Sequence, residues 1–296
     1  MRAPRALIPL LAVCGAAAIV AFAGAGAAIE HDPAPVLADS VVEDAAPATI
    51  TAMTWNVCGD ARPECPSGTD PGALVDAVAR EAAANSVGGR RVAANAILLQ
   101  EVCSAQVTAL GDAPAFRDWT WVFSPDAPDA VCANGQGRPG VALGARGPLG
   151  DVRTVALPAD QGQGRAAVCA TSPQWATRLC SASFSDAAQD PSGAWRARQA
   201  AALAKAAGPG RTVFGGHLAA EPTAPALDGL YADFDECDEG PDSRDGGKTL
   251  QDWRGHAVTK TDYLFVNAES TVSCAVPRSP NPSSDHRPLT SVVHFP

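Results

Sequence analysis

The polar residues best suited to chemistry lie beside apolar segments that are predicted to be strands. Glu101 ends an apolar run that starts at Ala96, and a buried carboxylate there is costly unless it is paired. Carboxylate oxygens suit a hard cation such as Mg²⁺, which makes Glu101 a candidate metal ligand. Asp285 and His286 lie near the chain end, one strand after Asp262. An imidazole beside a carboxylate can bind an anion or transfer a proton.

The segment 212–222 is predicted to be a buried strand that runs into a glycine-rich turn. Gly215 and Gly216 would allow the backbone to approach a ligand closely, and His217 follows them. Asn56 ends another predicted strand, where it could equally be an ordinary turn-forming asparagine. Glu101 has a similar alternative, as a glutamate at a solvated strand end.

Strands and helices are predicted within one domain over residues 50–296. Helices are expected at 72–84, where apolar residues recur at helical spacing, and at 195–207. The acidic segment 227–245 is expected to be a solvated loop. The predicted strands cover 50–57, 96–102, 119–123, 140–145, 166–171, 179–184, 212–214, 260–266 and 291–295.

Five motifs, in this order, resemble those of the endonuclease/exonuclease/phosphatase (DNase-like) superfamily. They are Thr-Trp-Asn at 54–56, Gln-Glu-Val at 100–102, Gly-Gly at 215–216 with Pro222, Thr-Asp-Tyr at 261–263 and Ser-Asp-His-Arg-Pro at 284–288. The last motif is the most specific. The resemblance implies an α/β (α+β) fold, a four-layer sandwich of two packed mixed β-sheets flanked by helices. The site would lie where strand ends from both sheets converge.

The resemblance also implies roles for the matching residues. Glu101, Asn56 and Asp285 would hold a divalent metal ion, Mg²⁺ or Mn²⁺. His286, oriented by Asp262, would bind the scissile phosphate or act on the attacking water, so both are predicted to be catalytic.

One predicted helix carries a further match to the family. Arg196 and Gln199 lie three residues apart on one helix face and match an Arg-x-x-Gln pattern. They are predicted to bind substrate, and a surface arginine is the plain alternative.

Three positions of the predicted site depart from the family pattern. His217 replaces the aspartate that orients or deprotonates the water, and Ala219 replaces the asparagine that holds the phosphate. Ser183 stands where the DNase-like branches have a histidine. His217 is expected either to replace the aspartate as a catalytic base or metal ligand, or to turn away and fill space. As a ligand it would make Zn²⁺ possible as well.

Two functions follow from this pattern. The first is a metal-dependent phosphoester (phosphodiester) hydrolase with a weakened site, because removing a general base costs on the order of 10²–10⁴ in rate. The second is a non-catalytic relative that binds a phosphorylated ligand or a protein. The partner would be a phosphate-ester small molecule or nucleic acid. The net charge of −10 and the lack of a dense Lys/Arg run disfavour non-specific nucleic-acid binding. The chain is expected to be a monomer.

Residues 1–28 have the features of an export signal. A short basic start precedes an apolar segment with small residues near its end. Cleavage would release a secreted protein without membrane contact, although the apolar segment is long enough to remain as a membrane anchor. Residues 29–49 are rich in Ala, Pro and acids and are predicted to be a disordered linker.

Eight cysteines lie beyond the signal segment. An even number in an exported chain indicates disulfides, whereas a cytosolic protein would keep free thiols. No Cys-x-x-Cys pair occurs, so a structural zinc site is not expected. Pairing of sequence neighbours, each bracketing one loop or strand-to-strand step, predicts Cys58–Cys65, Cys103–Cys132, Cys169–Cys180 and Cys237–Cys274.

Overall fold

The structure is a computed structural model that describes residues 45–60, 65, 68, 70–160, 163–240, 243–252, 254–267 and 269–296. The predicted signal at 1–28 and most of the predicted linker lie outside these residues. The first strand begins at Ala48, two residues before the predicted start of the domain. Within the described ranges, no helix is both long enough and apolar enough to cross a bilayer.

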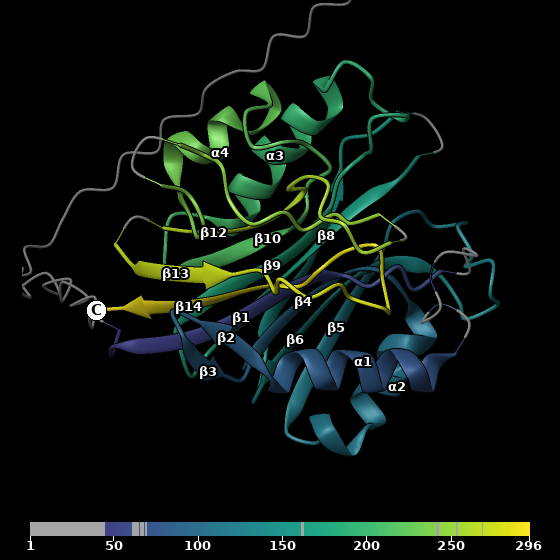
Figure 1. The fold of residues 1–296 in the computed structure, drawn as a ribbon, viewed down its shortest axis with the longest axis horizontal. Helices are drawn as coiled ribbons and strands as arrows, with labels where there is room; N and C mark the ends of the chain where they lie inside the picture. The colour runs from purple at the N-terminus through teal and green to yellow at the C-terminus, as the bar shows by residue number, and fades with distance from the viewer. Residues whose placement is uncertain are drawn as a thin grey trace, which may run out of the picture. The chain divides into compact units, whose positions relative to one another are not determined.

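Two six-stranded sheets pack against each other, with helices on both outer faces (Figure 1). The first sheet has the order β13-β14-β1-β4-β6-β5 and the second β11-β12-β10-β9-β8-β7. The first contains β1 (Ala48–Asn56), β4 (Ala96–Cys103), β5 (Trp119–Pro125), β6 (Pro139–Arg146), β13 (Thr271–Ala275) and β14 (Leu289–Phe295). The second contains β7 (Gly150–Leu157), β8 (Arg165–Ser172), β9 (Thr177–Ser183), β10 (Thr212–His217), β11 (Asp235–Glu236) and β12 (Asp262–Val266).

Both sheets are mixed, as predicted. In the first sheet β1 runs parallel to β4 and antiparallel to β14. In the second, β10 runs parallel to β9 and antiparallel to β12. The parallel pairs lie at the centre of each sheet and place the ends of β1, β4, β9 and β10 at the same side of the domain.

Alternation of side chains along the central strands explains the layers. Successive strand residues point to opposite faces, so a strand covered on both sides reads as a continuous apolar run. In β4, Leu98 packs between the two sheets and Leu99 packs under the outer helices. In β10, Val213 packs between the two sheets and Phe214 packs under the outer helices of the second sheet. Both sides of each sheet are therefore buried, which requires four layers.

Four α-helices in the described part of the chain form the outer layers. They are α1 (Pro71–Ala83) and α2 (Ser104–Asp112) on the first sheet, and α3 (Ala194–Ala207) and α4 (Asp228–Asp233) on the second (Figure 1). Asp70 caps α1 by accepting a hydrogen bond from the Gly72 amide at 2.8 Å, and Pro71 occupies the first turn. A short hairpin of β2 (Asn85–Val87) and β3 (Arg90–Val92) follows α1.

The acidic segment 227–245 differs from the solvated loop expected from the sequence. It contains α4 and β11, and Glu236 is only 2% exposed. The Lys260 Nζ donates to Glu236 Oε2 at 2.7 Å and lies 3.7 Å from an Asp238 oxygen. A partner 24 residues away thus allows a carboxylate in this segment to be buried.

All four predicted disulfides are present: Cys58–Cys65, Cys103–Cys132, Cys169–Cys180 and Cys237–Cys274. Cys169 and Cys180 are directly opposed in the β8–β9 register, as the hairpin prediction required. The Cys237–Cys274 bond joins the β11 edge of the second sheet to the β13 edge of the first. Such a bond typically adds about 2–4 kcal/mol by restricting the unfolded chain.

Candidate active site

Strand ends from both sheets surround one cleft with a volume of about 510 Å³. Glu101 comes from β4 of the first sheet, and His217 from β10 of the second. Asp285 and His286 reach the cleft from the loop before β14. Two loop segments complete its outer wall, 126–130 after β5 and 184–189 after β9.

A local distortion of β4 directs Glu101 toward the cleft. The β4–β6 register shifts between Leu99 and Val102, and Glu101 has a φ of +52°. A β-bulge inserts one residue and re-aims a side chain, and a positive φ is costly for a residue with a Cβ. Glu101 is consequently the partly exposed residue in a strand that is otherwise buried, with a side chain 24% exposed.

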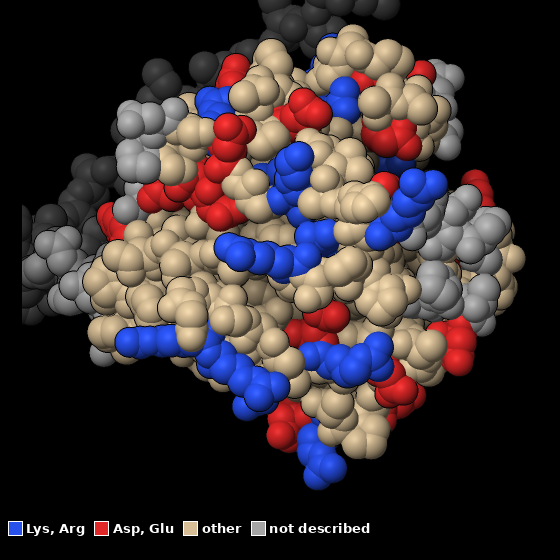
Figure 2. Space-filling model, viewed as in Figure 1, with Lys and Arg blue, Asp and Glu red and all other residues tan. Residues whose placement is uncertain are grey.

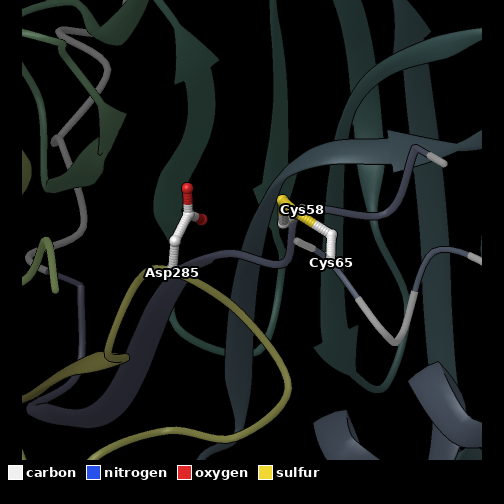
Figure 3. A group of neighbouring side chains, drawn as sticks. All are labelled: Cys58, Cys65 and Asp285. Carbon is white, nitrogen blue, oxygen red and sulfur yellow. A yellow bond between two sulfur atoms is a disulfide. The ribbon is translucent and has the colours of Figure 1, made fainter. Parts of the chain in front are cut away.

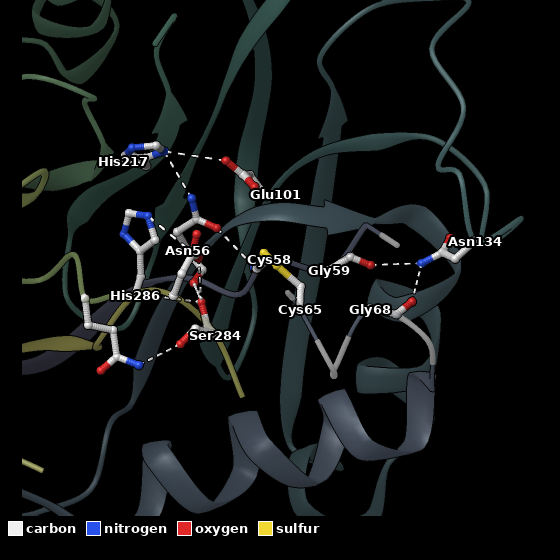
Figure 4. The surroundings of a disulfide bond; sticks show 12 residues. Asn56, Cys58, Gly59, Cys65, Gly68, Glu101, Asn134, His217, Ser284 and His286 are labelled. Carbon is white, nitrogen blue, oxygen red and sulfur yellow. Dashed lines mark hydrogen bonds and ion pairs between the residues drawn. A yellow bond between two sulfur atoms is a disulfide. The ribbon is translucent and has the colours of Figure 1, made fainter. Parts of the chain in front are cut away.

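Asn56 and His217 are joined across the two sheets. The Cys58 backbone N–H donates to Asn56 Oδ1 at 3.0 Å, which turns the amide NH₂ toward His217 Nδ1 at 3.1 Å (Figure 4). An amide NH₂ can only donate, so Nδ1 is the acceptor and a neutral His217 carries its proton on Nε2. Glu101 Oε1 lies 3.7 Å from the same Nδ1.

Buried hydrogen bonds fix the loop that carries His286. The Ser284 hydroxyl donates to the Asn56 carbonyl at 2.8 Å, and the Trp55 indole N–H donates to the His286 carbonyl at 2.9 Å. Arg287 is 7% exposed and donates from Nη2 to the Gly255 carbonyl at 2.6 Å. The end of β1 therefore positions both Asn56 and the Asp285-His286 pair.

His286 and Asp262 form a buried charged pair. His286 Nδ1 lies 2.7 Å from Asp262 Oδ2, and the Thr261 hydroxyl donates to that oxygen at 3.0 Å. Burial alone would lower the pKa of His286. The charge and hydrogen bond of Asp262 outweigh burial, with help from Asp285 and Glu101, and raise the pKa to about 9. His286 is therefore an imidazolium at neutral pH.

The second histidine has the opposite character. Burial, and then the charge of nearby His286, lower the pKa of His217 below its usual range. The two ring centroids are 4.8 Å apart in an edge-to-face arrangement. The cleft thus contains one charged and one neutral imidazole.

The donors in the cleft fit a hard divalent cation. Glu101 and Asp285 offer carboxylate oxygens to the same cleft, and Mg²⁺ commonly binds through one or two carboxylates, waters and a substrate phosphate. Asn56 is buried and does not line the cleft; its Oδ1 accepts the Cys58 amide and has a second lone pair left. The metal role of these three residues remains a prediction.

Two other clusters of potential ligands are closed by disulfides. Within the described residues, Cys58 and Cys65 lie close to Asp285 (Figure 3), and Cys103 and Cys132 lie close to Asp60. The sulfurs in each cluster are bonded to each other and cannot act as thiolate ligands.

The central turn, residues 217–222, has a backbone conformation at position 219 that suits asparagine, although the residue there is alanine. Ala219 has a φ of +51°, a conformation that costs alanine roughly 1–2 kcal/mol and suits asparagine better. Arg196 Nη1 donates to the Ala219 carbonyl at 2.6 Å, and Nη2 donates to the Asp190 carbonyl at 2.8 Å. Ser183 is paired with His217 in the β9–β10 register.

The two residues predicted to bind substrate are engaged within the protein. Arg196 holds the central turn, and Gln199 is fully buried. The Gln199 side chain accepts from the Ser185 backbone N–H at 3.0 Å and donates to the Pro158 carbonyl at 2.8 Å. Their contact with substrate remains a prediction.

Arg165 and Asp126 were not singled out by the sequence. Among the described residues that line the cleft, Arg165 is the only lysine or arginine. Its Nη1 lies 3.5 Å from Asp126 Oδ2. Burial raises the pKa of Asp126 to about 6, while the charge of Arg165 opposes the shift. Neither residue belongs to a recognisable motif, so only the fold brings them to the site.

The fold is shared with solved structures of very different sequence. An endonuclease/exonuclease/phosphatase family protein from Bacteroides thetaiotaomicron superposes with a TM-score of 0.65 at 13% identity, covering 85% of this chain and 99% of that one. A mannosyl-6-phosphatase from Bacteroides thetaiotaomicron VPI-5482 gives 0.62 at 12%, covering 83% and 100%. The human Nocturnin catalytic domain with bound sulfate gives 0.59 at 15%, covering 84% and 95%.

The amino-acid sequence also matches a protein-family model. A search of curated proteins finds no match to this chain. The model described as "Endonuclease/Exonuclease/phosphatase family" matches residues 53–286, which include all five motifs up to His286. The chain belongs to the endonuclease/exonuclease/phosphatase family.

Proposed function

We propose that this protein is an exported, divalent-metal-dependent phosphoester hydrolase with a weakened active site. The observation that carries the proposal is the buried His286–Asp262 pair, which opens onto the same cleft as Glu101 and Asp285. The charged imidazole could bind a phosphoryl group, and the two carboxylates could bind a cation. Membership of the family suggests the same class of reaction.

Each residue of the site would have a separate role in the reaction. Glu101 and Asp285, with Asn56, would hold Mg²⁺ or Mn²⁺, which supplies Lewis acidity when bound. The His286 imidazolium would donate to a phosphoryl oxygen or to the departing alkoxide, and Asp262 keeps it protonated. Arg165, which lines the same cleft and lies 3.5 Å from Asp126, would add a second positive charge.

The weakness lies in activating the water. His217 is neutral, but its Nδ1 is occupied by the Asn56 amide and its Nε2 carries the proton. It can accept a proton only after that hydrogen bond breaks. A lost general base costs on the order of 10²–10⁴ in rate, so we expect slow turnover. Zn²⁺ binding by His217 would require the same rearrangement.

The substrate is proposed to be a phosphate-ester small molecule. The net charge of −10 opposes a polyanion. Lys and Arg side chains are interspersed with Asp and Glu on the face shown in Figure 2. Export is supported by four disulfides, which persist in oxidising compartments.

The second candidate is a non-catalytic protein that binds a phosphorylated ligand or a protein through this cleft. Two features favour it. The Nδ1 of His217 is occupied and cannot act on the water, and alanine at position 219 has no amide to hold the phosphate. The charged His286 would still bind phosphate.

Turnover separates the two candidates. Bis(p-nitrophenyl) phosphate and p-nitrophenyl phosphate should be hydrolysed slowly with Mg²⁺ or Mn²⁺ and not with chelator. Glu101→Gln should remove this activity, whereas Glu269→Gln, at an exposed glutamate outside the cleft, should preserve it. Absence of metal-dependent turnover on both esters, with phosphate binding retained, would favour the binding protein.

A further inference from the structure

A second depression borders the candidate active site, with a volume of about 630 Å³. It lies between segment 187–197 and the turn 219–226, and Thr261 lines both it and the cleft. We call it the alanine pocket, after the side chains that form most of its wall: Ala187, Pro191, Ala194, Ala197, Ala219, Ala220, Ala224, Pro225 and Ala226.

The charges at the alanine pocket do not favour an anion. Among its described lining residues, Arg196 is the only lysine or arginine. Its two terminal nitrogens donate to the carbonyls of Ala219 and Asp190, its Nε lies 3.5 Å from a buried Asp190 oxygen, and its side chain is only 12% exposed. Glu221 is exposed at the rim, where the Thr259 hydroxyl is 3.4 Å away. The charge presented to a ligand is therefore negative.

We propose that the alanine pocket binds an uncharged apolar group, aryl or alkyl, that is esterified to the phosphate held in the cleft. The inference rests on the proposed function, because the phosphate must lie at His286. The turn 219–226 begins two residues after His217, and Thr261 lines both depressions, so a group leaving the cleft past this turn reaches the methyl-lined wall. A nucleic acid would instead place a further phosphate near Glu221, which repels it.

Phosphonates that cannot be hydrolysed test this by binding alone. Calorimetry in the presence of Mn²⁺ should show phenylphosphonate binding about tenfold more tightly than methylphosphonate. Burying part of the phenyl ring's apolar surface should strengthen binding by roughly that factor. Ala197→Phe should fill the pocket and abolish the preference without changing the affinity for methylphosphonate. Ala201→Phe is the matched control, since Ala201 is exposed one turn further along α3 and does not line the pocket.

The outcomes distinguish failure of the pocket assignment from failure of the proposed function. Equal affinity for the two phosphonates in the wild type overturns the pocket assignment and leaves the proposed function standing. A preference that survives Ala197→Phe, or is lost equally in Ala201→Phe, also overturns it. If neither phosphonate binds and no phosphate ester is hydrolysed, the proposed function and the pocket assignment both fail.

Discussion

Removing the carboxylate of Asp262 should change how stability depends on pH. Against the effect of burial, the charge and hydrogen bond of Asp262, helped by Asp285 and Glu101, raise the pKa of His286 from 6.5 to about 9. At 1.36 kcal/mol per unit, the folded state gains about 3 kcal/mol from protonating His286. Because the folded pKa is raised, this gain is complete below pH 6.5 and is lost as the pH rises through 9.

The variant Asp262→Asn leaves burial as the main influence on His286, so the imidazole should become neutral at pH 7 and this pH dependence should disappear. Urea unfolding at several pH values between 6 and 9.5 measures the free energy of unfolding, and NMR titration of the imidazole reports the pKa directly. Asp252→Asn is the matched control, because Asp252 contacts His256 at 3.0 Å with both side chains exposed. Solvent screens an exposed pair of this kind, so losing it should leave the free energy of unfolding almost unchanged. The reasoning is refuted if His286 titrates below pH 7 in the wild type, or if both variants show the wild-type pH dependence.

Two other variants test the central turn and the buried ion pair. The double change His217→Asp with Ala219→Asn should raise phosphodiester hydrolysis at least ~10², since it restores a water-orienting carboxylate and a phosphate-holding amide that act on one transition state. Each single change should do little. A folded double variant with no gain in a kinetic assay would contradict the idea that Glu101, Asp285 and His286 still hold a working geometry. Lys260→Met should cost roughly 3–5 kcal/mol in chemical denaturation, because it leaves Glu236 buried without a counter-charge. Lys248→Met at an exposed position should cost almost nothing, and equal effects of the two lysine variants would refute the argument.

Much of the fold could be predicted because its central strands are buried on both faces. Continuous apolar runs such as that of β4 mark these strands, and period-2 alternation within them creates the layers. Glu101 and His286 could be singled out because each belongs to a local motif, one near the end of β4 and the other in the loop before β14. The disulfide pairs were correct because each joins segments that the fold places side by side.

The remaining features depend on contacts between distant parts of the chain. The bulge at Glu101 and the pairing of Arg165 with Asp126 have no local signal. Glu236 looked solvated because only the distant Lys260 makes its burial possible. Helix α2 was missed because it is short and contains Gly111, a poor helix former.

A crystal structure of the protein soaked with Mn²⁺ and phosphate would test the central claim most directly. Anomalous scattering locates the ion without ambiguity. We predict one Mn²⁺ bound by Glu101 and Asp285, and one phosphate hydrogen-bonded to His286. Mn²⁺ bound elsewhere, or a cleft in which phosphate avoids His286, would contradict the assignment of this cleft as a metal-dependent phosphoesterase site.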